Sequence, residues 1–232
     1  MSNDILLLAE HLSGKLADIT YEMAGKAKAL AAAFGGKAVA VLLGSGAQSL
    51  AESIGADSVV YVDDPALAEF NPEAYGRVLA ALIEERSPRL VLLGNTSAGM
   101  DLGAGLSVTT GLPLIAYVNG LAAEGGTLVA TSQIYGGKIM AEAVPDGAAC
   151  IVSCLAGAFP ADAGRGNAPV ETIPAPVPLG DLRVRRAVHA AIDRRALLET
   201  LTFGEGGYDQ PGACAICPGR IDEKELLTLP GW

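Results

Sequence analysis

Residues 88–117 read PRLVLLGNTSAGMDLGAGLSVTTGLPLIAY. Within this stretch an apolar run at residues 90–93 stops at Gly94 and is followed by small polar residues. A glycine-punctuated segment then has the composition of a helix from about Leu102. Such a break places backbone N–H groups, hydroxyls and one carboxylate at the carboxyl end of a buried strand. Open parallel sheets bind ligands at that edge, so the stretch predicts both a fold class and a candidate site.

Composition sets the outer limits of the interpretation. Half of the 232 residues are hydrophobic and 18% are charged, so the chain can bury a sizeable core. The net charge, 16 − 26 = −10, argues against nucleic acid as the main partner. No apolar run reaches the length of a membrane span, and the amino terminus lacks the basic region of a signal peptide. We therefore expect a cytoplasmic protein with reduced cysteines.

Strand-length apolar runs alternate with helical segments over the first hundred residues. We expect strands at residues 5–9, 37–43, 58–62 and 90–94, and helices at residues 20–34, 48–54 and 71–86. The last helix has Asn71 as its N-cap and Pro72 at its first position. This alternation predicts an α/β fold with a doubly wound, mostly parallel sheet covered by helices on both faces.

The pattern changes after Pro113. Four short apolar runs, separated by glycine-rich turns, predict an additional antiparallel β section; they lie at residues 114–121, 127–135, 139–144 and 149–155. Residues 161–180 are rich in proline and are expected to form a linker. Residues 181–232 are expected to be helical at first and irregular afterwards. The predicted division is therefore a domain at 1–160, a linker at 161–180 and a tail at 181–232.

Several segments match a known family in the same order. They are ILLLAEH at residues 5–11, LLGSG at 42–46, LLGNTSAGMDL at 92–102, TGL at 110–112, QIYGGK at 133–138 and GAFP at 157–160. Together these segments resemble the N-terminal domain of the α subunit of electron transfer flavoproteins. The resemblance covers residues 4–160. It implies a Rossmann-like domain of the adenine-nucleotide-binding superfamily.

The resemblance also implies a function. The chain would be a non-catalytic subunit that pairs with a β-type partner and helps carry electrons from a flavin dehydrogenase to an acceptor. The Gly-Arg-Gly and Gln-x-Gly-x-Thr-Gly segments that mark the family's FAD-binding domain do not occur after residue 170. FAD would therefore be held mainly by, or shared with, a partner. Two alternatives stay open, namely a stand-alone AMP-binding module and a scaffold or regulatory subunit that uses a cysteine pair for metal or redox chemistry.

In this superfamily the carboxyl edge holds AMP or FAD, which gives a set of cofactor-binding candidates. They are Glu10, His11, Gly44, Ser45, Gly46, Asn95, Thr96, Ser97, Gly99 and Asp101, with Tyr135 and Lys138 at a hairpin tip. If Gly99 faces the ligand, a side chain there should block binding and leave the fold intact. The alternative is a plain strand-to-helix connection that Thr96 or Ser97 caps, with Asp101 favouring the helix N-terminus. The hairpin tip would then be a plain turn.

Cys214 and Cys217 form a Cys-x-x-Cys pair in the tail. Such a pair can bind a metal ion or an Fe–S cluster, or form a redox disulfide, and it can also consist of incidental thiols. Cys150 and Cys154 could complete a metal site by number, but their apolar strand is typical of buried, inert thiols. Five arginines at residues 183–195 form either a solvated helix face or a docking surface for an acidic partner.

Overall fold

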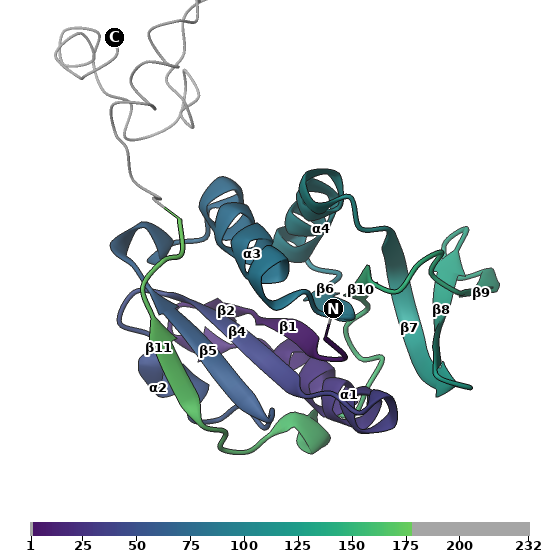
Figure 1. Ribbon diagram of the computed structural model, residues 1–232, viewed down its shortest axis with the longest axis horizontal. Helices are drawn as coiled ribbons and strands as arrows, with labels where there is room; N and C mark the ends of the chain where they lie inside the picture. Colours follow the sequence, from purple (N-terminus) through teal and green to yellow (C-terminus); the bar gives the residue numbers. More distant parts are fainter. Residues whose placement is uncertain (1, 178–232) are drawn as a thin grey trace, which may run out of the picture. The chain divides into compact units, whose positions relative to one another are not determined.

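Apolar runs form the strands of a single mixed sheet that has helices on both faces (Figure 1). The computed structural model describes residues 2–177. The nine sheet strands are β1 (Ile5–Ala9), β4 (Ala38–Gly44), β5 (Ser58–Asp63), β6 (Leu90–Gly94), β7 (Leu114–Glu124), β8 (Thr127–Ile134), β9 (Ile139–Ala143), β10 (Cys150–Cys154) and β11 (Val170–Ile173). A separate two-stranded pair joins β2 (His11–Leu12) and β3 (Lys15–Leu16). The helices are α1 (Asp18–Phe34), α2 (Gln48–Ala51), α3 (Pro72–Arg86) and α4 (Ser97–Thr110), with 3-10 turns η1 (Pro65–Leu67) and η2 (Ala161–Gly164).

Successive side chains of the central strands enter two different cores. In β1, Ile5 and Leu7 join the cluster on the α1 side, whereas Leu6 and Leu8 join the cluster under α3 and α4. A strand points alternate side chains to opposite faces, so a fully apolar strand must be covered twice. This explains why all five residues of β1, β6 and β10 are buried. Among the helices described, none is long and apolar enough to cross a membrane.

The strand order contains a switch point at β1. The nine strands pair in the order β11-β5-β4-β1-β6-β10-β7-β8-β9. From β1 the chain moves outward through β4 to β5, and it then returns to the other side of β1 to form β6. Crevices at such a reversal, outside the carboxyl ends of the strands, are the usual ligand sites of doubly wound sheets. In this sheet the reversal falls between the carboxyl ends of β1 and β6.

The predicted antiparallel section is smaller than the sequence suggests. Strands β7, β8 and β9 are antiparallel, but β10 lies between β6 and β7 and is parallel to both. Strand β7 also bends, because Tyr117 has a φ of 56° and both β7 ladders shift register beside it. At the β7–β8 turn, the carbonyl of Gly126 accepts a hydrogen bond from Arg89, which directly precedes β6. Local composition cannot predict this, since strand order depends on distant pairing.

Residues 161–177, predicted as linker, also differ from expectation. The turn η2 packs on α1 so closely that a Cβ on Gly164 would overlap the carbonyl oxygen of Tyr21. Strand β11 then pairs in parallel with β5, and the N–H of Val59 donates to the carbonyl of Pro169. The prolines flank this strand instead of interrupting it, so they permit an edge strand. Residues 178–180 of the predicted linker, the arginine-rich segment that is expected to be helical, and the pair Cys214 and Cys217 lie outside the described residues.

Candidate functional site

At the switch point, the side chain of Glu10 connects the carboxyl ends of β1 and β6 by hydrogen bonds. Its Oε1 accepts a hydrogen bond from the N–H of Gly94 at 3.0 Å, and its Oε2 accepts one from the Thr96 hydroxyl at 2.8 Å. The backbone of Glu10 is itself held by Thr20, whose hydroxyl oxygen accepts from the Glu10 N–H at 2.9 Å. The carboxylate that follows β1 therefore bridges to the loop that follows β6. Glu10 and Thr96, which were expected at the same edge, are in direct contact.

Burial and hydrogen bonding act on Glu10 in opposite directions. Desolvation raises the pKa of the Glu10 carboxyl above its usual range, and the hydrogen bonds from Thr96 and Gly94 oppose that rise. Both donors favour the ionised form because they point at its oxygens. The edge between β1 and β6 thus carries the Glu10 carboxyl group, whose hydrogen-bond donors come from the protein itself.

The helix that leaves this edge starts earlier than predicted. The Thr96 hydroxyl oxygen accepts from the N–H of Gly99 at 3.0 Å, which makes Thr96 the N-cap and Ser97 the first residue of α4. The expected start near Leu102 is wrong because the cap, and not the apolar pattern, decides where a helix begins. Ser97 itself is exposed to solvent.

Gly99 does not act as the sequence suggests. A Cβ on this residue would overlap the carbonyl oxygen of Gly94 and lie 3.3 Å from Oε1 of Glu10. The missing side chain therefore lets α4 approach the end of β6. The expectation that a side chain at Gly99 blocks a ligand and leaves the fold intact is not compatible with this contact.

Asn95 connects the same loop to strand β10 by two hydrogen bonds. Its Oδ1 accepts from the Ser153 hydroxyl at 2.8 Å, and its N–H donates to the carbonyl of Cys154. Ser153 is buried in an apolar strand, and the sequence contains no local signal that links it to Asn95, 58 residues earlier.

A cavity of about 420 Å³ lies on the β4 side of β1. It gathers three of the predicted residues, His11, Ser45 and Gly46, together with the apolar and aromatic side chains of Leu12 and Phe70. The His11 ring lies with Nε2 2.7 Å from the carbonyl oxygen of Leu43, where a protonated Nε2 would donate. Gly44 lies next to the ring, since a Cβ on this glycine would be 3.4 Å from Nε2 of His11. The loops after β1 and β4 therefore converge, as predicted from the fold class.

The remaining predicted residues lie elsewhere. Asp101 is one turn into α4 and lines a separate cavity of about 230 Å³ between α3 and α4, with Arg77 among its neighbours. Five residues after the N-cap, the helix has turned it away from the edge. Tyr135 and Lys138 are exposed in the β8–β9 turn, at the far end of the sheet. Four strands (β6, β10, β7 and β8) lie between β9 and β1, which Glu10 follows. Because neighbouring strands are about 4.8 Å apart, the β9 end is far from Glu10.

Glu22 is a second buried carboxylate, and no motif in the sequence singled it out. Glu22 lies on α1 and is 6% exposed. Its carboxylate oxygens accept hydrogen bonds from the N–H of Gly157, at 2.9 and 3.0 Å, and from the N–H of Phe159, at 3.3 Å. It holds the loop that follows β10. The available signal was a lone carboxylate on the otherwise apolar face formed by Ile19 and Met23.

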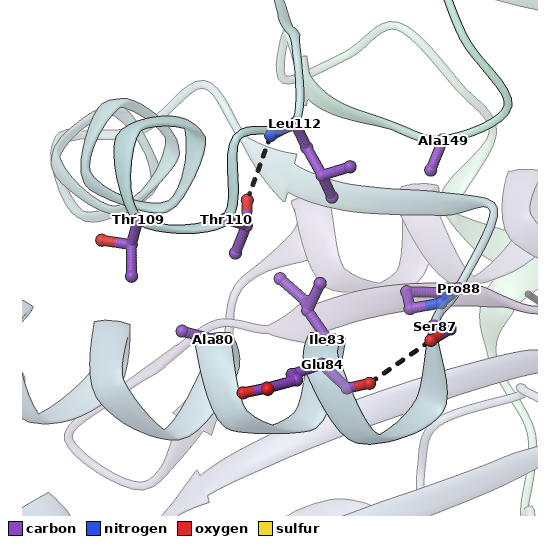
Figure 2. A pocket seen from close by; sticks show the side chains of 9 residues that line it. All are labelled: Ala80, Ile83, Glu84, Ser87, Pro88, Thr109, Thr110, Leu112 and Ala149. Atoms are coloured by element: carbon purple, nitrogen blue, oxygen red, sulfur yellow. Dashed lines mark hydrogen bonds between the residues drawn. The ribbon is translucent and has the colours of Figure 1, made fainter.

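A larger cavity lies at the opposite edge of the sheet. This cavity has a volume of about 600 Å³ and lies between the carboxyl ends of α3 and α4. Figure 2 shows Glu84, Ser87, Thr110 and Leu112 around it. Pro88 and Ala149, which also line it, precede β6 and β10, so the cavity is at the amino ends of these strands. Doubly wound sheets place their ligands at the carboxyl ends, so this cavity is not the candidate site. Within residues 2–177, no three His, Cys, Asp or Glu side chains are grouped to hold a metal ion.

Comparison with known proteins gives a consistent family assignment. The electron transfer flavoprotein domain matches residues 5–178. The electron transfer flavoprotein subunit alpha of Megasphaera elsdenii is 33% identical over 148 residues, which are 61% of this chain and 44% of that protein. The subunit alpha of Thermoanaerobacterium thermosaccharolyticum is 35% identical over 142 residues, 60% of this chain and 43% of its own length.

A third relative extends further along the chain. Protein FixB of Clostridium saccharobutylicum is 31% identical over 187 residues, which are 78% of this chain and 56% of that protein. The chain spans less than half the length of the two subunits alpha that it matches.

Proposed function

This chain belongs to the electron transfer flavoprotein domain family, and from that premise we propose that it acts as an α-like subunit that pairs with a β-type partner. The observation that carries the proposal is the family match over residues 5–178, joined by relatives whose names describe them as subunits alpha. In this proposal the pair carries electrons from a flavin dehydrogenase to an acceptor in the cytoplasm. The chain itself positions the partner and performs no catalytic step.

The flavin is proposed to be held mainly by the partner. The redox chemistry of such a pair belongs to FAD, and the protein supplies its position and surroundings. The edge between β1 and β6 holds the Glu10 carboxylate, and Gly99 lies so near Gly94 that not even a Cβ fits between them. We infer that this arrangement does not suit the phosphates of FAD or AMP. His11, Ser45 and Gly46 line the open cavity beside it, and we assign any contact with a nucleotide base to these residues. A stand-alone AMP-binding module is not favoured, because the relatives are electron transfer subunits.

The surface that we assign to the partner is the edge strand β9. Its outer side has no neighbouring strand among the described residues, and Ile139 and Met140 are 48% and 53% exposed. Ile134, which pairs with Ile139, is also exposed. Exposed edge strands with apolar side chains are sites where another chain adds its own strand or covers the face. Strand β9 can therefore receive the β-type subunit without any change in the core.

An interface variant tests this assignment. Met140→Asp in the full chain should weaken its complex with the β-type subunit by roughly tenfold or more, because a charge would be buried at the contact. Val108→Asp is the matched control, since Val108 is 87% exposed on α4, away from β9. Affinity is measured by titration followed by light scattering. Equal affinities for Met140→Asp and the wild type would remove β9 from the interface.

A further inference from the structure

We infer that the switch-point edge of this chain is closed to nucleotide phosphates, because the carboxylate of Glu10 takes the place that a phosphate would need. Doubly wound domains place the phosphate of a nucleotide at this edge, where N–H groups and hydroxyls point outward. In this chain the Gly94 N–H, the Thr96 hydroxyl and the Gly99 N–H already donate within the protein. The inference concerns residues of this chain alone and does not depend on any partner.

Three hydrogen-bond donors at the edge have acceptors within the protein. The Gly94 N–H and the Thr96 hydroxyl both donate to Glu10. The Gly99 N–H, one turn further on, donates to the Thr96 hydroxyl oxygen. A phosphate placed here would have to displace the carboxylate to obtain the same donors. The carboxylate is covalently attached and needs no ordering from solution, so it competes well for them.

The space at the edge is also filled. Oε1 of Glu10 lies so close to Gly94 that a Cβ on this glycine would overlap it, and the same Cβ would lie 3.2 Å from Cγ1 of Ile19. On the other side, a Cβ on Gly99 would overlap the carbonyl oxygen of Gly94. The glycines thus serve to bring β6, α4 and Glu10 together. They do not form a cradle around a ligand.

Charge adds to the closure. A nucleotide phosphate is an anion, and at this edge it would stand beside the Glu10 carboxyl group, which is negative when it is ionised. Like charges at such a distance repel strongly where the medium is less polar than water. The same carboxylate ties the ends of β1 and β6, which in a nucleotide-binding domain the ligand would bridge. The domain therefore holds its switch point together without a nucleotide.

The test compares AMP and adenosine binding to the full chain by calorimetric titration. Adenosine has the same base and ribose and lacks the phosphate, so the ratio of the two affinities isolates the phosphate. Wild-type protein is compared with Glu10→Gln, which removes the charge and keeps the size, and with Glu10→Ala, which removes both. Glu124→Gln, at the exposed end of β7, is the control for net charge. Circular dichroism checks that each variant is folded.

We expect wild type and Glu124→Gln to bind AMP no more tightly than adenosine. Glu10→Ala should bind AMP roughly tenfold more tightly than the wild type does, since both the repulsion and the obstruction are gone. Glu10→Gln should gain less, because its side chain still fills the edge. Equal AMP affinity in wild type and Glu10→Ala would overturn the inference. So would AMP binding by the wild type that is tighter than adenosine binding and is lost in Glu10→Ala.

Discussion

Replacing Glu22 by alanine is expected to lower the free energy of unfolding by about 3 kcal/mol, because hydrogen bonds to a charged group contribute roughly 1.5–3 kcal/mol each and two N–H groups would lose their acceptor. Those groups are the N–H groups of Gly157 and Phe159, in the loop after β10. The loss is smaller than the sum of the bonds because the variant also removes a buried charge.

Two further variants separate the carboxylate from other effects. Glu22→Gln keeps one acceptor oxygen and should lose about half as much stability as Glu22→Ala. Lys28→Ala, an exposed position of the same helix, should stay within about 0.5 kcal/mol of the wild type. Urea unfolding followed by circular dichroism gives all three values. A Glu22→Ala protein as stable as Lys28→Ala would show that the loop is held by other contacts.

The second large effect is expected at Gly99. Gly99→Ala should lower the free energy of unfolding by about 2–3 kcal/mol, because overpacking in a rigid environment typically costs 1–3 kcal/mol and the obstacle is backbone. The obstacle is the carbonyl oxygen of Gly94, at the end of β6, which cannot move without breaking the edge.

Gly105 of the same helix is the matched control. A Cβ there would meet nothing within 4 Å, so Gly105→Ala should raise stability by about 0.5–1 kcal/mol through helix propensity alone. The two glycine-to-alanine changes in α4 are thus predicted to have opposite signs. Thermal and urea unfolding of both variants give the two changes in the free energy of unfolding. A shift of the same sign in both would mean that α4 does not rest on β6 as described.

Elements with strong local signals were predictable from the sequence. Helix α3 begins at Pro72 after the N-cap Asn71, and β6 covers Leu90–Gly94, both as expected, because caps, prolines and apolar runs act locally. The doubly wound class followed from the alternation of such elements, and the family match agrees with it.

Features that depend on distant contacts were not predictable. The position of β10 between β6 and β7, the Glu10–Thr96 bond across 86 residues and the Glu22–Gly157 bond across 135 residues have no local signature. The direction in which Asp101 points depends on the residue at which α4 begins. A predicted start that is a few residues too late leaves Asp101 at the carboxyl edge of the sheet, whereas it lines the cavity between α3 and α4. Sequence patterns could place several candidate residues at one edge. They could not show that these residues bind one another.

The most direct test of the proposed role is the composition of the native complex. The full chain, purified together with the β-type subunit from its source, is measured by size-exclusion chromatography with light scattering and by visible absorbance. We expect a one-to-one heterodimer that carries flavin, and an isolated chain that shows no flavin absorbance after incubation with FAD. An isolated chain that binds FAD stoichiometrically, or one that stays a monomer in the presence of the β-type subunit, would contradict the account.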